Sequence, residues 1–247
     1  MAKNKILYVC QEISPYLPEN ELSKLSIEMA RQMQERGDEV RTFMPRFGCI
    51  NERRNQLHEV IRLSGMNLII NDNDHQLIIK VASIPAARIQ IYFIDNDDRA
   101  IFFARGMLET VKKLRWSPTI VHCHGWFSAI VPMYLKKVFY DDPLFRDVKI
   151  VLSVADDKFD GMLAADLKQK LEGEGVMDSK MSVLEEPSYE NLYRFVIDYA
   201  DGVIATSANA DPAVLEYARS NGKRVLEYAE GDAKEIFDNY KKFYDEL

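Results

Sequence analysis

The residues best suited to chemistry follow short apolar runs of the chain. His122, Cys123 and His124 place two imidazoles and a thiol within three residues, a composition that suits a metal ion. On an extended chain, however, His122 and Cys123 point to opposite sides, and no nearby histidine or cysteine pair supplies further ligands. We therefore expect no metal site. One of the two histidines is expected to be buried and the other to line a crevice.

The loop after the first apolar run carries groups that could contact a ligand. Residues 11–16 read Gln-Glu-Ile-Ser-Pro-Tyr, and the candidate ligand-lining residues are Glu12, Ser14 and Tyr16. Glu12 could equally serve as a helix cap or a turn carboxylate. Neither G-x-G-x-x-G nor G-x-x-x-x-G-K-[ST] occurs in the chain, so the two common phosphate-binding loops are absent.

Three later loops supply the remaining candidates. The acids Asp156 and Asp157 follow an apolar run and could bind a cation or sugar hydroxyls, although such pairs are commonly solvated turn residues. Thr206 and Ser207 could bind a ligand or, as we expect, simply begin the next helix. Trp126 is expected to pack between helix and sheet, but an aromatic ring at a crevice mouth could also stack on a sugar.

Composition excludes several classes of protein. The 247 residues include 32 Lys and Arg against 39 Asp and Glu, a net charge of −7, which argues against nucleic acid or an anionic membrane as partner. Three scattered cysteines make no disulfide framework, so we expect a reduced, cytoplasmic setting. The uncharged stretch 116–135 contains prolines and histidines that a membrane-spanning helix would have to bury, so we expect no membrane segment.

Hydrophobic patterning predicts the elements that carry these loops. Buried strands are expected at 6–10, 40–44, 119–122, 148–154, 202–205 and 224–226, and helices at 22–33, 100–115, 127–140, 162–171, 189–199, 212–221 and from 233. Asp211 before Pro212 predicts a helix cap, and Asp232 with Glu235 has the spacing of a capping box. The last helix is expected to place Ile236, Tyr240, Phe243 and Leu247 on one face. Short β-rich runs between 57 and 94 indicate an antiparallel excursion, and 173–188 reads as a polar, mobile stretch.

The order of these elements predicts an α/β fold. Strand–helix–strand alternation indicates a doubly wound, mostly parallel, Rossmann-like sheet in a single domain spanning residues 1–247. In such sheets ligands bind outside the carboxyl ends of the strands. The loops after residues 10, 122, 154 and 205 are therefore expected to meet at one edge.

Four motifs in these loops carry a family resemblance. They are KILYVCQEISPY at 5–16, ERGDEVR with MPRF within 35–47, PTIVHCHGW at 118–126 and YADGVIATS at 199–207. In this order they resemble the N-terminal catalytic-domain portion of the bacterial glycogen and starch synthases. Those enzymes transfer glucose from ADP-glucose to the end of an α-1,4-glucan. The resemblance runs from about residue 5 to 218 and implies one Rossmann-like half of a two-domain, GT-B type glycosyltransferase.

The first departure from the family falls at its phosphate-binding segment. Where the family has A-K-T-G-G-L, residues 17–22 read Leu-Pro-Glu-Asn-Glu-Leu. Pro18 stands for the lysine, Glu19 for the threonine, and Asn20 and Glu21 for the glycine pair. A pyrophosphate needs positive charge and bare backbone N–H groups, which carboxylates would repel. This segment argues against a nucleotide sugar as ligand.

Other departures remove groups with catalytic roles in the family. Phe127 occupies the position of a histidine that follows the H-x-H-D-W motif, and Gly125 replaces the aspartate of that motif. In the segment that resembles [TV]-I-H-N, Ala155 replaces the histidine. We leave the catalytic residues unassigned.

The resemblance covers only the N-terminal half of the family, and we expect the last strand and helix to close the fold. We therefore expect a non-catalytic relative, a pseudoenzyme that serves as a glucan-binding or regulatory module, with an α-glucan or a protein as partner and no cofactor. One alternative is an active ADP-glucose-dependent glucosyltransferase that works with a partner chain. Another is an α/β domain for an unrelated small ligand or protein.

Overall fold

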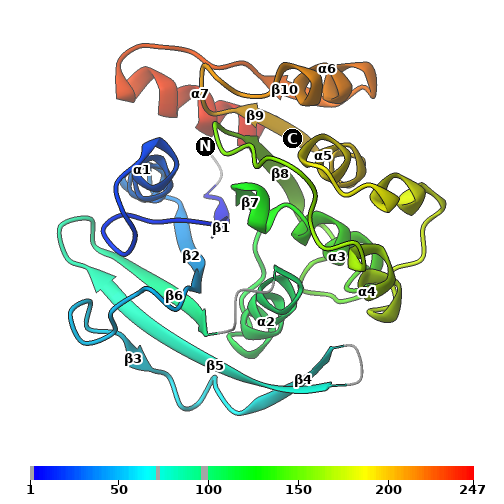
Figure 1. The fold of residues 1–247 in the computed structure, drawn as a ribbon. Helices are drawn as coiled ribbons and strands as arrows, with labels where there is room; N and C mark the ends of the chain where they lie inside the picture. The colour runs from blue at the N-terminus through cyan, green and yellow to red at the C-terminus, as the bar shows by residue number, and fades with distance from the viewer. Residues whose placement is uncertain (1–2, 71–72, 96–99) are drawn as a thin grey trace.

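The computed structural model describes residues 3–70, 73–95 and 100–247 (Figure 1). These residues form a ten-stranded sheet in the order β10-β9-β8-β7-β1-β2-β6-β5-β3, with β4 paired to β5. The strands are β1 (Lys5–Cys10), β2 (Glu39–Arg46), β3 (His58–Glu59), β4 (Met66–Ile70), β5 (Asn73–Ile84), β6 (Ile89–Asp95), β7 (Ile120–His124), β8 (Lys149–Val154), β9 (Gly202–Ala205) and β10 (Arg224–Leu226).

The strand directions confirm the predicted fold class. Every pairing from β10 through β1 to β6 is parallel. The pairings of β5 with β3, β4 and β6 are antiparallel, which is the excursion expected between residues 57 and 94. Parallel strands bring their carboxyl ends to one edge, so the loops after β1, β7, β8 and β9 share that edge.

Helices cover both faces of the sheet. They are α1 (Glu21–Glu35), α2 (Ala100–Lys113), α3 (Val131–Lys137), α4 (Leu167–Gly173), α5 (Tyr189–Ile197), α6 (Pro212–Ser220) and α7 (Ala233–Asp245), with short 3₁₀ turns η1 (Trp126–Ser128) and η2 (Ser179–Glu185). In Figure 1, α1 and α7 lie on one side of the central strands, and α2 and α3 lie on the other.

Strand β1 shows why both faces need cover. Successive side chains of a strand point to opposite faces. Leu7 and Val9 accordingly join the core beneath α2 and α3, whereas Ile6, Tyr8 and Cys10 join the core beneath α1 and α7. All five side chains are fully buried, as a continuous apolar strand in a doubly covered sheet should be.

Two predicted helices are shorter than expected. The segment 127–140 divides into η1 and α3, because Pro132 lacks an N–H and begins a new helix in the first turn of α3. The helix expected at 162–171 begins only at Leu167. Its predicted first turn is not helical, and the Leu163 N–H donates to the carbonyl of Pro187 at 2.9 Å.

The segment 173–188 is not the mobile polar stretch that its composition suggested. It contains η2, and Val176, Met181 and Leu184 are buried in the larger core. Their spacing fits neither a helical nor a strand period, so hydrophobic periodicity could not predict that these three side chains are buried.

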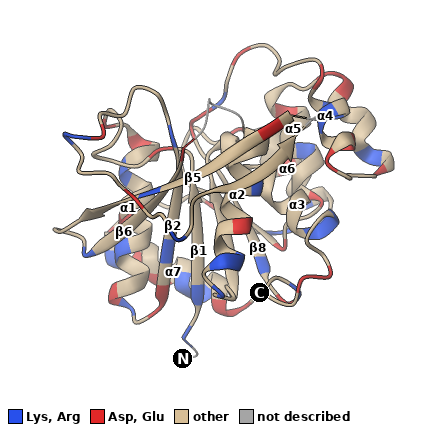
Figure 2. Cartoon of the chain, turned by 90° about the horizontal axis from the view of Figure 1, so that it is seen from below, with Lys and Arg blue, Asp and Glu red and all other residues tan. Residues whose placement is uncertain are grey.

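The last helix, α7, packs on the same face of the sheet as α1 and covers β1 there. Phe237, Tyr240, Phe243 and Tyr244 are buried there, whereas Ile236, predicted for this face, is only half-buried. The capping box expected from Asp232 does not form, since that side chain makes no cap hydrogen bond. Seen from below, basic and acidic residues are scattered among uncharged ones along the visible helices (Figure 2).

Within the described residues, no helix is both long and apolar enough to cross a bilayer.

Candidate functional site

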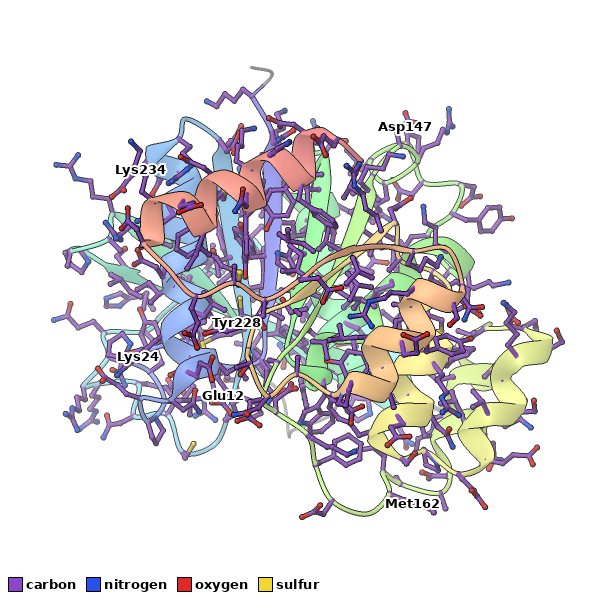
Figure 3. The ribbon with its side chains drawn as sticks, turned by 90° about the horizontal axis from the view of Figure 1, so that it is seen from above. Glu12, Lys24, Asp147, Met162, Tyr228 and Lys234 are labelled. Carbon is purple, nitrogen blue, oxygen red and sulfur yellow. The ribbon has the colours of Figure 1, made fainter. Side chains whose placement is uncertain are left out.

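A crevice of about 350 Å³ lies at the carboxyl ends of β1 and β8 and beside the start of α1. In Figure 3, Glu12 marks this end of the molecule, and Asp147, which precedes β8, marks the opposite end. The lining residues are Gln11, Glu12, Asn20, Glu21, Leu22, Asp156, Asp157 and Lys158. The fold therefore brings together two predicted ligand-lining residues, Glu12 and Asp156, with two positions that depart from the family motif.

Asn20 connects the β1 loop to α1. Its amide Nδ2 donates to Glu12 Oε2 at 2.6 Å, and its Oδ1 accepts from the Ser23 backbone N–H at 2.7 Å. The Ser23 hydroxyl in turn accepts from the Asn20 N–H at 3.0 Å, which completes a capping box. The side chain of Asn20 thus occupies a helix-start N–H that an anion would otherwise bind. Glu12 takes the role of a turn carboxylate that also faces the crevice.

Glu21 connects α1 to the loop after β9. The Ser207 hydroxyl donates to Glu21 Oε2 at 3.1 Å, a contact between residues 186 positions apart. Thr206 donates through Oγ1 to the carbonyl of Val154 at 3.3 Å. Both hydroxyl residues are buried, and neither begins a helix as predicted, because α6 begins at Pro212.

The helix after that loop uses a predicted cap. The carboxylate of Asp211 accepts from the N–H groups of Ala213 and Val214, so the sequence signal of aspartate before proline is confirmed. Lys158 donates to Asp211 at 2.7 Å and to Glu190 at 3.2 Å. The lysine that lines the crevice is therefore already paired with two carboxylates.

Asp157 and Asp156 have different roles. Asp157 is half-buried and accepts from the Trp126 N–H at 2.7 Å and from the Tyr189 hydroxyl at 2.9 Å. Burial raises the pKa of Asp157, and these two hydrogen bonds partly oppose that rise. Asp156 is exposed and accepts from the Asn209 amide at 3.1 Å. Asp157 thus holds the β7 loop in place, while Asp156 faces solvent at the crevice.

The two histidines of β7 do not line the crevice, which corrects the prediction for His122 and His124. Both are fully buried. The Nδ1 atom of His122 lies 2.6 Å from the Tyr244 hydroxyl, and its Nε2 lies 2.7 Å from the Ser153 hydroxyl. The Nε2 of His124 donates to the carbonyl of Leu22 at 3.3 Å. These partners hold both rings inside the core, whereas the sequence led us to expect that one of them would line a crevice.

Two further candidates lie elsewhere. Tyr16 is buried with its ring edge-on to Phe93 at 4.8 Å between centroids, so it packs in the core and does not meet the crevice. Ser14 lines a neighbouring groove between α1 and α7. Trp126 is half-buried, and its ring packs edge-on against Phe159 at 4.9 Å.

The family positions at 125, 127 and 155 are occupied by packing residues. Phe127 is buried against Phe103, with 5.8 Å between ring centroids, and its N–H donates to Gln11 Oε1 at 3.0 Å. Gly125 has a φ of +92°, and a Cβ there would lie 2.6 Å from the Cβ of Gln11. Ala155 is also buried. The positive φ of Gly125 and the Gln11 side chain packed against it therefore disfavour any larger residue at this position.

The first two substituted positions face solvent. Pro18 and Glu19 are both exposed, and Glu19 pairs with Lys24 at 3.0 Å. Within residues 3–70, 73–95 and 100–247, no group of three or more His, Cys, Asp or Glu side chains is arranged to hold a metal ion.

Comparisons with known proteins identify the family of this chain. A family model of the starch synthase catalytic domain matches residues 5–225. Glycogen synthase from Chlorobium limicola is 34% identical over 189 residues, and that from Pelodictyon phaeoclathratiforme is 32% identical over 225 residues, or 82% of this chain. The chain spans 39% and 45% of the lengths of these two relatives.

Among solved structures, the catalytic domain of starch synthase IV from Arabidopsis thaliana, bound to ADP and acarbose, superposes with a TM-score of 0.72 at 14% identity. The match covers 95% of this chain and 53% of that structure, and at this identity it supports the fold alone. The family match over most of the residues, together with these relatives, decides the membership. The chain belongs to the starch synthase catalytic domain family.

Proposed function

We propose that this domain binds an α-glucan at the carboxyl-end crevice and does not by itself transfer glucose from ADP-glucose. One observation carries the proposal: Glu12, Glu21, Asp156 and Asp157 all line the crevice, and Lys158 beside them is paired with Asp211 and Glu190. The crevice therefore presents an excess of carboxylates.

Such a crevice disfavours the donor. The pyrophosphate of a nucleotide sugar is bound by basic side chains and by free N–H groups at a helix start. Here Asn20 caps α1, and Glu21 extends its carboxylate toward Ser207 across the same edge. Two like charges near a surface repel each other, and the repulsion grows as water is displaced.

The chemistry of transfer also lacks its family groups. Phe127 and Ala155 are apolar and buried at positions where the family has histidines. A general catalyst or charge-stabilising donor contributes factors of about 100 or more in rate, so losing two such groups should abolish measurable transfer.

An acceptor glucan needs different groups. Carboxylates accept hydrogen bonds from sugar hydroxyls, and amides both accept and donate them; the crevice supplies these groups through Asp156, Glu12 and Gln11. The half-buried indole of Trp126, next to this edge, offers an apolar face of the kind on which a sugar ring can stack. With three free cysteines and a storage glucan as ligand, a cytoplasmic location fits this role.

Native gel electrophoresis with and without glycogen in the gel tests the binding step. We expect selective retardation of the purified chain, and reduced retardation of Asp156→Ala. Lys234→Ala is a matched control, since Lys234 is exposed on α7 and outside the crevice. Unchanged migration of the wild-type chain in glycogen would contradict the proposal.

A transfer assay separates a binding module from an enzyme. We expect no incorporation of labelled glucose from ADP-glucose into glycogen, either by this chain alone or after mixing with candidate partner proteins. Transfer restored by a second chain would replace the proposal with that of a glucosyltransferase assembled from two chains.

A further inference from the structure

A second cavity, of about 360 Å³, lies between α1, the end of β9 and the connection from β10 to α7. In Figure 3, Tyr228 lies on that connection beside α1. Its wall includes Glu21, Leu25, Tyr228, Glu230, Ile236 and Tyr240. The cavity shares Glu21 with the crevice and takes Leu25 from the same helix, but its remaining lining residues come from the ends of β9 and β10, the connection from β10 to α7, and α7.

The charged residues that line this cavity are all acidic. None of its lining residues is Lys, Arg or His. Glu227 is neutralised by Arg219, which donates to both of its carboxylate oxygens at 2.8 Å and 2.9 Å. Glu230 makes no hydrogen bond or ion pair with any described residue, and Glu21 has Ser207 as its hydrogen-bond partner. Two carboxylates from separate segments thus lack a cationic partner within the described part of the chain.

Tyr240 provides an independent sign that the cavity is built for a ligand. This side chain is only 6% exposed, yet its hydroxyl makes no hydrogen bond with a described residue. Burial raises the pKa of Tyr240, so the phenol stays neutral. Its oxygen can accept a hydrogen bond from a donor group of an occupant. The hydroxyl itself is not among the fully buried unpaired polar atoms of the described residues, so it reaches the open space of the cavity and is available to an occupant.

The apolar part of the wall limits the kind of occupant. Leu25 of α1 and Ile236 of α7 both line the cavity, and the same two residues continue into a groove of about 540 Å³ whose wall is apolar at Ile27 and Phe237 and charged at Lys24 and Glu28. An occupant that matches this wall carries positive charge at its ends and hydrocarbon between them.

We propose that this cavity binds an aliphatic amine of the diamine or polyamine class. Its ammonium groups pair with Glu21 and Glu230, the Tyr240 hydroxyl accepts from one ammonium group, and its methylenes lie on Leu25 and Ile236. Tyr228 supplies an aromatic face on which a cation is also stabilised. This proposal goes beyond glucan binding and does not depend on it.

Calorimetric titration with spermidine and putrescine tests the cavity. We expect saturable binding to the wild-type chain and affinity weakened about fivefold in both Glu230→Gln and Tyr240→Phe. Glu235→Gln is the matched control, because Glu235 is an exposed acid of α7 outside the cavity, and its affinity should equal that of wild type. Circular dichroism of each variant verifies that the fold is retained.

Chemical-shift mapping locates the amine. We expect shifts at Leu25, Leu226 and Ile236 when spermidine is added, and none at Ala155. Absence of saturable binding, equal weakening by Glu235→Gln and Glu230→Gln, or shifts confined to other surfaces would each overturn the proposal. Glycogen retardation is measured separately, so a failure here leaves the glucan proposal standing, and the reverse holds as well.

Discussion

The Nδ1 atom of His122 lies 2.6 Å from the hydroxyl oxygen of Tyr244, which joins a central strand to the last helix. On its other side the imidazole contacts the Ser153 hydroxyl at 2.7 Å, and Tyr244 contacts the Tyr8 hydroxyl at 3.1 Å. A buried chain of polar groups therefore runs from β8 through β7 to α7 and β1. Because all members are buried, the chain holds α7 in one position on the sheet.

This arrangement predicts a pH dependence of stability. Burial lowers the pKa of His122 well below its ordinary value and lowers the pKa of His124 to about 4. In the unfolded chain both protonate near pH 6.5, so the unfolded state binds more protons below that pH. Stability is full above about pH 6.5 and should fall by up to about 1.4 kcal/mol per pH unit for each neutral histidine as the pH drops toward 5.

Urea denaturation at several pH values between 7 and 5 checks this. His122→Gln should be less stable at pH 7 but show a shallower dependence on pH. His58→Gln is the control, since His58 is exposed on β3, and it should keep the wild-type dependence. An unaltered pH slope in His122→Gln would refute the assignment.

Two glycines with the same backbone angle predict different costs. Gly125 and Gly37 both have a φ of +92°, but a Cβ at Gly125 meets Gln11 at 2.6 Å, whereas a Cβ at Gly37 meets nothing within 4 Å. Gly37→Ala should therefore cost only the backbone strain, about 1 kcal/mol of unfolding free energy. Gly125→Ala should cost about 1–3 kcal/mol more, because the Gln11 side chain must move and give up its bond to the Phe127 N–H. Equal losses of unfolding free energy in the two variants, measured by chemical denaturation, would show that Gln11 can move away at no cost in stability.

Two adjacent lysines of α7, Lys241 and Lys242, should contribute very different amounts to the stability of the fold. Lys241 is 8% exposed at its side chain and lies 3.1 Å from the Asp38 carboxylate, which is 1% exposed. Lys241→Met leaves that buried carboxylate without its cation and should cost about 3 kcal/mol. The side chain of Lys242 is 73% exposed, and its ammonium nitrogen lies 3.8 Å from Glu246, a longer contact in solvent. Lys242→Met should therefore cost about 0.5 kcal/mol or less. Thermal or urea unfolding of the two variants compares them directly, and similar losses would mean that the buried pair contributes little.

The loop before α1 predicts a gain of nucleotide affinity. The triple variant Pro18→Lys, Asn20→Gly, Glu21→Gly adds a cation, removes the cap and removes a crevice carboxylate. We expect its affinity for ADP, measured by calorimetry, to rise about tenfold or more over wild type. Glu59→Lys, an exposed position on β3, changes the net charge by the same two units and should show no gain. If the triple variant gains nothing, this loop is not what excludes the donor.

Much of this protein was readable from the sequence alone. Continuous apolar runs predicted the parallel strands, aspartate before proline predicted the start of α6, and four motifs in order predicted the family. These features are local, because the hydrophobic period and the capping chemistry of a segment depend on its own residues. The same local rules misjudged 162–166, which is not helical, and 173–188, whose apolar side chains are buried in the core.

The site itself was decided by tertiary structure. Glu21 and Ser207 are 186 residues apart and meet only because α1 begins and β9 ends at the same edge of the sheet. His124 had the residue type and position of a crevice residue, yet the packing of α1 over β7 buries it against Leu22. Which side chains a loop presents depends on what packs over it, and packing is a property of the assembled elements that no single segment encodes.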